Sequence, residues 1–155
     1  CMGGEEQITL DIPLEKAGNT YIGSFTVSED AKLVTFLFED EYGELKDNNG
    51  EKGYYTVLYE ADRKTPVPKA YYELSGSLVF GYMGRVQIES DMARAQKLLK
   101  EEQSRNPELK NDPDVFQLSA IISFEQEDEE ALEGVKQKLK EFTKPKEDEK
   151  KLEAA

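Results

Sequence analysis

The sequence predicts an α+β fold, in which a β-sandwich-type region over residues 5–62 is followed by antiparallel helical hairpins over residues 66–155. Two observations predict this order. In the first part of the chain, apolar residues alternate with polar ones, which is the period of a half-buried strand. After Pro68, apolar residues recur every fourth position, which is typical of an amphipathic helix.

The β region begins with two segments that predict strands. The first is Gln7–Leu14, in which every second residue is apolar. Pro13 favours an edge position for this strand, or an early end, because proline cannot donate a ladder hydrogen bond. Residues 16–19 predict a turn. The second strand follows, with three apolar side chains on one face: Tyr21, Phe25 and Val27.

Two further strands complete the predicted β region. Leu33–Phe38 is almost wholly apolar and predicts the most buried strand. Tyr54–Tyr59 predicts the fourth. Between them, residues 39–53 contain several turn signals, including Asp47-Asn48-Asn49-Gly50. These signals predict a connection that crosses between strands rather than a tight hairpin.

The helical region is predicted by spacing and by capping residues. A first helix is indicated by four residues at every fourth position, Ala70, Leu74, Leu78 and Tyr82, although Gly76 and Gly81 weaken the pattern. Ser90 predicts the N-cap of the next helix. The later helices are expected over Asp91–Arg105, Asp114–Phe124 and Asp128–Thr143. Lys146–Ala155 predicts the opening of another helix, so the region is interpreted as the start of a longer helical array.

The charge balance excludes polyanionic partners. The chain has 20 basic and 33 acidic residues, a formal net charge of −13. Both halves are acidic, so neither offers a basic face to nucleic acid or to an anionic membrane surface. The longest apolar run, Leu33–Phe38, is far shorter than the roughly 20 residues of a spanning helix.

The missing residue types point away from catalysis. The chain has no His and a single Cys. It therefore lacks the commonest general base, the commonest zinc ligand and any Cys-X-X-Cys redox pair. The sequence predicts no catalytic residue, no metal site and no cofactor, so the expected function is non-catalytic.

The single cysteine is the first residue, Cys1. A mature chain that begins with Cys is what remains when a bacterial lipoprotein signal is cleaved and the new terminal Cys is lipidated. Cys1 is therefore a candidate lipidation site, with residues 1–6 as a tether and the lipid as the one expected link to a membrane. A cloning remnant is the alternative interpretation.

Three stretches in order carry a resemblance to a known family. They are Tyr21–Phe25 with Val27 and Ala31, then Leu33–Phe38 with its acidic continuation, then Asp47-Asn48-Asn49-Gly50 leading to Gly53-Tyr54. The chain resembles the accessory region found ahead of the redox domain in envelope thioredoxin-like (redoxin) lipoproteins. There, an immunoglobulin-like (Ig-like) sandwich precedes tetratricopeptide-like (TPR-like) helical hairpins.

The resemblance implies a non-catalytic accessory or interaction domain of a bacterial cell-envelope lipoprotein, on the periplasmic side. It implies a protein partner or a neighbouring redox domain, with which the chain is associated. The sequence departs from the family in lacking the Cys-X-X-Cys motif. It also supplies four or five predicted strands, where a complete sandwich has about seven.

The alternative function is a carbohydrate-binding β-sandwich module for glucans. The Asp-Asn-Asn-Gly…Tyr stretch resembles the tail of starch-binding modules, in which exposed aromatic rings stack on sugars. Trp is the usual platform and is absent here, so Tyr side chains would replace it. The candidate sugar-binding residues are Tyr42, Tyr54, Tyr55, Asn48 and Asn49.

Overall fold

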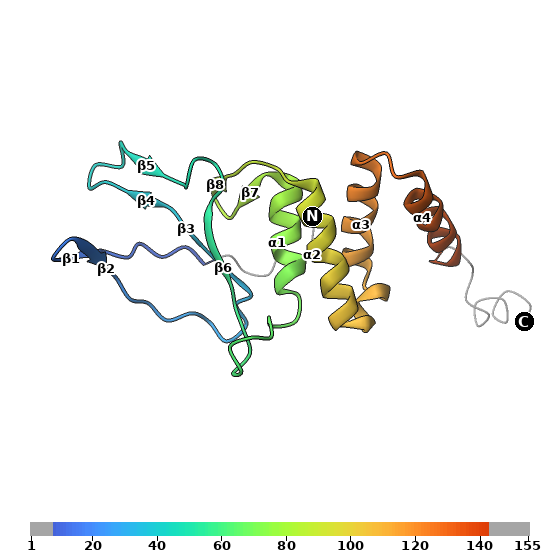
Figure 1. Ribbon diagram of the computed structural model, residues 1–155, viewed down its shortest axis with the longest axis horizontal. Helices are drawn as coiled ribbons and strands as arrows, with labels where there is room; N and C mark the ends of the chain where they lie inside the picture. The colour runs from blue at the N-terminus through green and yellow to red at the C-terminus, as the bar shows by residue number, and fades with distance from the viewer. Residues whose placement is uncertain (1–7, 143–155) are drawn as a thin grey trace, which may run out of the picture.

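The computed structural model describes residues 8–142 and has an α+β fold within that range (Figure 1). Small antiparallel sheets, each of two strands, come mainly before the helices, and none closes into a barrel. Four α-helices and one 3₁₀-helix make up the rest of the regular structure in this range. The α+β class predicted from the sequence is therefore confirmed.

The strands pair in four antiparallel couples. They are β1 (Glu15–Ala17) with β2 (Thr20–Ile22), β3 (Leu33–Phe36) with β6 (Tyr54–Val57), β4 (Phe38–Glu39) with β5 (Lys46–Asp47), and β7 (Tyr82–Met83) with β8 (Val86–Gln87). The helices are α1 (Ala70–Phe80), α2 (Met92–Arg105), α3 (Pro113–Glu125) and α4 (Glu129–Phe142), with the 3₁₀-helix η1 (Pro107–Asn111) between α2 and α3. In Figure 1 the β region lies at one end, and α1 to α4 follow in chain order toward the other.

The helix predictions are confirmed to within a few residues, and the structure corrects two of their ends. Gly81 takes a left-handed conformation (φ 71°) and donates its N–H to Ser77, so α1 ends before Tyr82. The predicted N-cap at Ser90 is wrong by one residue. The carboxylate of Asp91 caps α2 instead, because it accepts the backbone N–H of Arg94 at 2.9 Å.

The predicted strand Gln7–Leu14 is wrong over residues 8–14, which form no strand. Glu15 pairs with Ile22, so an extension of the β1–β2 ladder in the same register would place Pro13 opposite Ser24. Hydrogen-bonded pairs alternate along an antiparallel ladder, and that position is a hydrogen-bonded one. Proline has no N–H to donate there, so the hairpin ends at β1 and β2. Beyond them the two chain segments run apart (Figure 1).

Replacing Pro13 by valine is expected to extend the β1–β2 hairpin. Valine restores the missing N–H and favours strand conformation. In the extended register Ile12 lies opposite Phe25 at a non-hydrogen-bonded position, where the backbones approach closely. Nuclear Overhauser contacts between the Hα atoms of these two residues are therefore expected in Pro13→Val. Asp11→Val, which keeps the proline, is the control, and an unchanged spectrum in Pro13→Val contradicts this account.

The segment from Leu33 to Phe38 is less buried than the sequence predicts. It divides into β3 and β4, with Leu37 between them, and no side chain of β3 or β4 is fully buried. The predicted crossing connection over residues 39–53 is also wrong. That segment folds back as the β4–β5 hairpin and returns as β6, which pairs with β3. Turn residues therefore close local hairpins here, because Gly43 and Gly50 supply the left-handed conformations.

The hydrophobic core lies between the helices and the inner side of the β3–β6 sheet. Its buried residues are Val57, Ala70, Leu74, Leu78, Val79, Met83, Ile88, Ala95, Leu99, Leu109, Val115, Leu118 and Ile122. Most of them come from α1, α2 and α3. Leu33 and Tyr55 from the sheet pack against this core from the side. Most of the hydrophobic core of the described chain is therefore formed by the helices.

A buried carboxylate joins α1 to α2. Glu102 is 1% exposed and accepts the backbone N–H groups of Lys69 and Tyr71, each at 2.9 Å, and the side-chain amide of Asn106 at 2.6 Å. The first N–H groups of a helix have no partner within the helix. Lys69 is the N-cap residue of α1, and its side chain makes no capping bond. Glu102 therefore caps α1 from a neighbouring helix.

An ion pair between Lys69 and Asp112 holds the start of α3 close to the start of α1. Asp112 is the N-cap of α3 and accepts the N–H groups of Asp114 and Val115. The ammonium of Lys69 lies 2.9 Å from the same carboxylate. The hydrogen bond from Lys69, together with those two amides, lowers the pKa of Asp112 below its ordinary value.

Several predictions fall outside the described residues. They concern the lipidation of Cys1, the tether over residues 1–6 and the further helix at Lys146–Ala155. Among the described residues, no helix is both long enough and apolar enough to cross a membrane.

Candidate functional site

The exposed apolar side chains of the described chain are concentrated in the β region. Sixteen large hydrophobic residues are exposed within residues 8–142, and twelve of them lie at or before Tyr59. In residues 8–60, by contrast, Val57 is the one hydrophobic residue that is fully buried. Scattered exposed apolar residues are normal, whereas a concentration of them marks an interaction site. The β region is therefore the candidate site.

The β3–β6 sheet has one covered face and one open face. Leu33 and Tyr55 pack against the helical core, and Val57 is part of it. Alternate residues of a strand point to opposite faces, so Phe36 and Tyr54, which are paired across the two strands, lie on the outer face. Both are only half-buried. The outer face is therefore an apolar layer that the described chain covers incompletely.

Aromatic contacts extend this outer face across neighbouring segments. The ring of Phe25 meets that of Phe36 edge-on, with centroids 6.0 Å apart. The ring of Phe38 meets that of Tyr54 in the same way at 5.2 Å. Each of these four rings is at least partly accessible to solvent. One surface is thus shared by the segment that follows β2 and by the strands β3, β4 and β6.

The segment before β1 adds aliphatic side chains to this surface. A Cβ atom added at Gly23 would lie 2.8 Å from the Leu14 side chain and 3.1 Å from that of Ile12. Both side chains therefore lie against the backbone of residue 23, two positions before Phe25. Leu14 remains 44% exposed and Phe25 40%. The apolar surface is defined here by six residues: Ile12, Leu14, Phe25, Phe36, Phe38 and Tyr54.

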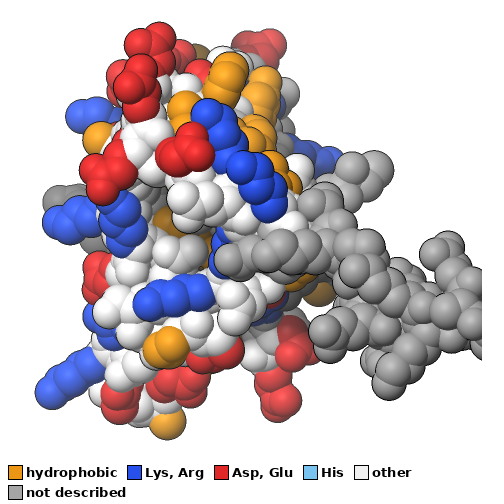
Figure 2. All heavy atoms as spheres, turned by 90° about the vertical axis from the view of Figure 1, so that its right-hand side faces the viewer, with side chains coloured by type: hydrophobic (Ala, Val, Ile, Leu, Met, Phe, Trp, Pro, Cys, Tyr) orange, Lys and Arg blue, Asp and Glu red, His pale blue; other side chains and the backbone are white. Residues whose placement is uncertain are grey.

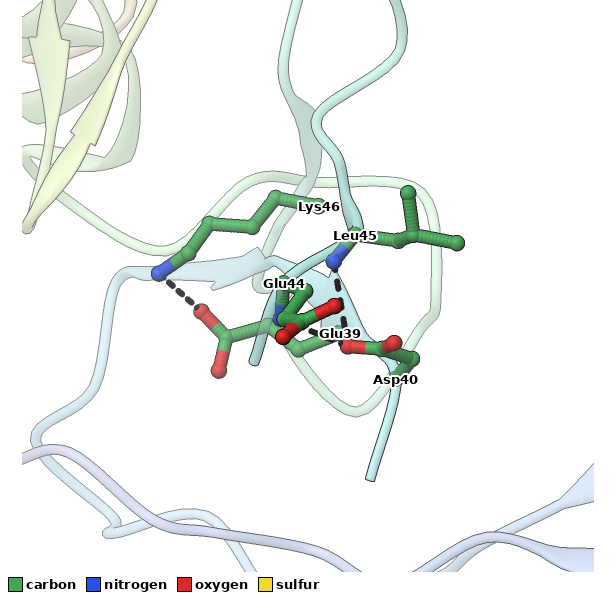
Figure 3. Close-up of polar contacts among 5 residues, drawn as sticks. All are labelled: Glu39, Asp40, Glu44, Leu45 and Lys46. Atoms are coloured by element: carbon green, nitrogen blue, oxygen red, sulfur yellow. Dashed lines mark hydrogen bonds and ion pairs between the residues drawn. The ribbon is translucent and has the colours of Figure 1, made fainter. Parts of the chain in front are cut away.

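The β4–β5 hairpin, which contributes Phe38 to the apolar surface, also carries several carboxylates, three of which are drawn in Figure 3. Asp40 accepts the backbone N–H groups of Glu44 and Leu45 at 2.8 and 3.0 Å, which fixes the turn. Lys46 forms an ion pair with Glu39 across the two strands at 2.6 Å. A shallow concavity of about 250 Å³ is lined by Phe38, Glu39, Asp40, Leu45, Lys46 and Asp47. Its lining combines apolar and acidic groups.

The β region is strongly acidic. Residues 8–60 contain 11 acidic and 4 basic residues, a net charge of −7. One of the four cations, Lys46, is paired with Glu39. Hydrogen bonds to these carboxylates also change the pKa values of two tyrosines. Hydrogen bonding to Asp47 raises the pKa of Tyr54, and hydrogen bonding to Glu41 raises that of Tyr42. A binding partner therefore meets apolar groups within a negative potential.

The predicted sugar-binding tyrosines do not form one platform. Tyr54 and Tyr55 are neighbours in β6, so they lie on opposite faces of the sheet. Tyr54 lies on the outer face and donates its hydroxyl to Asp47 at 3.1 Å. Tyr55 packs against the core, and the guanidinium of Arg94 lies over its ring. Tyr42 is 76% exposed at the turn of the β4–β5 hairpin.

The two predicted sugar-binding asparagines hold the loop itself together. Asn48 donates its amide to the carbonyl of Gln87 and accepts the N–H of Glu51. Asn49 donates its amide to the carbonyl of Gly53 and has a positive φ of 64°. The bonds to Glu51 and Gly53 are local contacts by which asparagine stabilises turns, and the bond to Gln87 joins the loop to β8. The amides of both asparagines are therefore engaged within the chain.

The described residues contain no group of three or more Cys, Asp or Glu side chains arranged to hold a metal ion. The acidic run at Glu39–Glu41 is engaged in turn and strand contacts through Glu39 and Asp40. Its side chains lie at the surface of the hairpin.

A second concavity, also lined by both apolar and acidic side chains, lies at the opposite end of the molecule. It measures about 530 Å³ and is lined by Phe124, Glu125, Glu127, Glu129 and Leu132, at the connection between α3 and α4. Figure 2 views this end and shows hydrophobic side chains gathered beside charged ones. Phe124 is 70% exposed. This concavity contains a single aromatic ring, Phe124, whereas the β region exposes many apolar side chains.

Sequence reasoning placed the candidate site on tyrosines and asparagines and missed the apolar surface. The alternation in residues 8–14 indicated that their apolar side chains would be buried on one face. Two other features of the sequence argued against that burial. Pro13 and the small number of predicted strands meant that these side chains lacked a second layer to cover them.

Comparison with known proteins identifies no relative. No protein-family model matches the chain, and no curated protein sequence or solved structure matches it either.

Proposed function

We propose that this chain is a non-catalytic accessory or interaction domain of a bacterial cell-envelope lipoprotein, associated with a thioredoxin-like protein on the periplasmic side. In this proposal the β region is part of an Ig-like sandwich, and α1 to α4 form TPR-like hairpins. Cys1 carries the lipid that anchors the domain.

The observation that supports an interaction function is the contrast between the two parts of the described chain. The helices close a core in which thirteen hydrophobic residues are buried, but the β region leaves twelve large apolar side chains exposed. Covering apolar surface stabilises a complex by about 25 cal/mol for each Å² removed from water. The apolar surface is therefore suited to a partner protein.

The chemistry of the side chains supports binding rather than turnover. The chain has no His. The carboxylates around the apolar surface are exposed or half-buried and are engaged with lysine, tyrosine or backbone groups: Glu39, Asp40, Glu41 and Asp47. Catalytic carboxylates are typically desolvated, which raises their pKa toward neutrality.

A photo-crosslinking residue at position 25, expressed in the source cells, tests this function. The expected result is an adduct with a thioredoxin-like protein of the envelope, identified by mass spectrometry. The matched control is the same residue at Phe124, an exposed aromatic at the far end of the molecule, where a much lower yield is expected. Absence of any protein adduct at both positions contradicts the proposed function.

The carbohydrate-binding alternative draws less support from the geometry. Stacking on a sugar chain requires two or three exposed rings side by side, and Tyr54 and Tyr55 lie on opposite faces of one strand. The amide of Asn48 is bonded to Gln87 in β8, and that of Asn49 is bonded to Gly53. Of the three candidate tyrosines, Tyr42 alone is mainly exposed, at 76%.

A further inference from the structure

We propose that the apolar surface receives one extended segment of a partner protein, apolar at alternate positions and flanked by lysine or arginine. This partner chemistry rests on the interaction function proposed above. Three features of the β region lead to it: strand-like sequence whose backbone pairs with no other described residue, apolar side chains grouped on one surface, and a surrounding excess of carboxylates.

The backbone of the β region favours an extended partner. Residues 9–13 and 24–27 make no backbone hydrogen bond to another described residue. Their composition is that of strands, with apolar residues at every second position. Unpaired strand-like backbone is a template for an added strand, which gives affinity through main-chain hydrogen bonds. A helix cannot supply those bonds, because its own backbone groups are satisfied internally.

The side chains of these two segments point to one apolar stripe. Continuing the β1–β2 register would set Leu14 opposite Gly23 and Ile12 opposite Phe25. Directly opposed residues of antiparallel strands share a face. In the structure Leu14 and Ile12 already lie against Gly23, and Phe25 contacts Phe36. A partner strand with apolar residues at alternate positions matches this stripe, since its other side chains face solvent.

The charge of the β region selects a basic partner over a second copy of the chain. Residues 8–60 carry a net charge of −7, so two copies that meet at this surface bring −7 against −7. Like charges oppose such a contact, whereas flanking lysine or arginine residues are attracted to it. The attraction is screened by salt. Binding of the expected partner is therefore stronger at low ionic strength, and self-association is weaker.

A displayed library of random peptides of about ten residues, the length of a long strand, tests the inference when it is selected on the full chain. The expected result is enrichment of peptides with Lys or Arg at the ends and with Val, Ile, Phe or Tyr at alternate positions. A synthetic copy of the most enriched peptide is then titrated against the protein. Its affinity should fall as salt is raised, and replacing its Lys and Arg by Glu should abolish binding.

Variants of the protein locate the bound peptide. Leu14→Ser and Phe25→Ser are each expected to weaken binding of that synthetic peptide about tenfold or more, as loss of a central apolar contact does. Phe124→Ser, at the α3–α4 concavity, removes an aromatic ring that is more exposed than Phe25 (70% against 40%) and should leave the affinity unchanged. Both β-region residues are partly exposed, so helical circular dichroism should be retained in all three proteins.

Four outcomes overturn the inference. They are enriched peptides without basic residues, binding lost in Phe124→Ser but kept in Phe25→Ser, recovery of no binding peptide at all, and a stable dimer at low ionic strength that is lost in Phe25→Ser. The crosslinking experiment separates these failures from failure of the proposed function. If a protein adduct forms at position 25 and any of the four outcomes is also found, the interaction function is supported. The inference that the partner binds through an extended segment flanked by basic residues is then rejected.

Discussion

Glu102→Ala is expected to destabilise the protein by about 3–5 kcal/mol, because it leaves several buried donors unpaired at about 1–3 kcal/mol each. Glu102 accepts the N–H groups of Lys69 and Tyr71 and the amide of Asn106, and it is 1% exposed. Alanine also leaves a cavity between α1 and α2. Urea unfolding followed by circular dichroism measures the change.

Two further variants serve as comparisons. One tests how much of the effect depends on the charge of Glu102, and the other tests the loss of an ordinary carboxylate from the surface of α2. Glu102→Gln keeps one acceptor oxygen but turns an amide donor toward other donors, so an intermediate loss is expected. Glu101→Ala removes an exposed carboxylate that pairs with Arg105 four residues on, and it should cost less than about 0.5 kcal/mol. If Glu102→Ala lowers the free energy of unfolding no more than Glu101→Ala does, Glu102 is not the cap of α1.

The position of Glu102 in the sequence indicates that its side chain is buried, although the composition does not. With 33 acidic residues, no single carboxylate stands out. On α2, however, Ala95 and Leu99 are buried, and Glu102 follows at the next position of the same stripe. An acidic residue on the apolar stripe of a helix predicts a buried partner, because an unpaired buried charge is costly. The identity of that partner required the tertiary structure, since Lys69 lies 33 positions away.

The helices could be predicted from the sequence because their signals are local. The spacing of Ala70, Leu74 and Leu78 fixes α1, and capping residues fix the start of α2 to within one position. The strands could not be predicted as well. Alternation identifies a segment that can form a strand, but pairing depends on a distant partner and on register. Pro13 decided the length of β1, and residues 39–53 closed a hairpin where the turn signals had predicted a crossing connection.

The candidate site was less predictable than the fold. Tyr54 and Tyr55 look equivalent in the sequence, yet one faces outward and the other packs on the core, because neighbours in a strand alternate. Which of the two faces is covered depends on where α1 and α2 lie. The apolar surface is therefore a property of tertiary structure.

Leu118→Ala is expected to cost about 2–5 kcal/mol, the usual range for truncation of a buried leucine. Leu118 is 1% exposed in α3 and belongs to the core formed with α1 and α2. Phe25→Ala removes a larger side chain from the β region but should cost less than about 1 kcal/mol, because the ring is 40% exposed. Urea unfolding of both variants measures the contrast.

This contrast links stability to binding. If the helices carry the stability, the β region is free to keep apolar groups exposed for a partner, and Phe25 can be changed without unfolding the chain. A bound partner covers Phe25 and adds stability by mass action. Phe25→Ala should then cost more in the presence of the selected peptide than in its absence, whereas the cost of Leu118→Ala should stay the same. Equal costs for Phe25→Ala in both conditions would place that ring outside the interface.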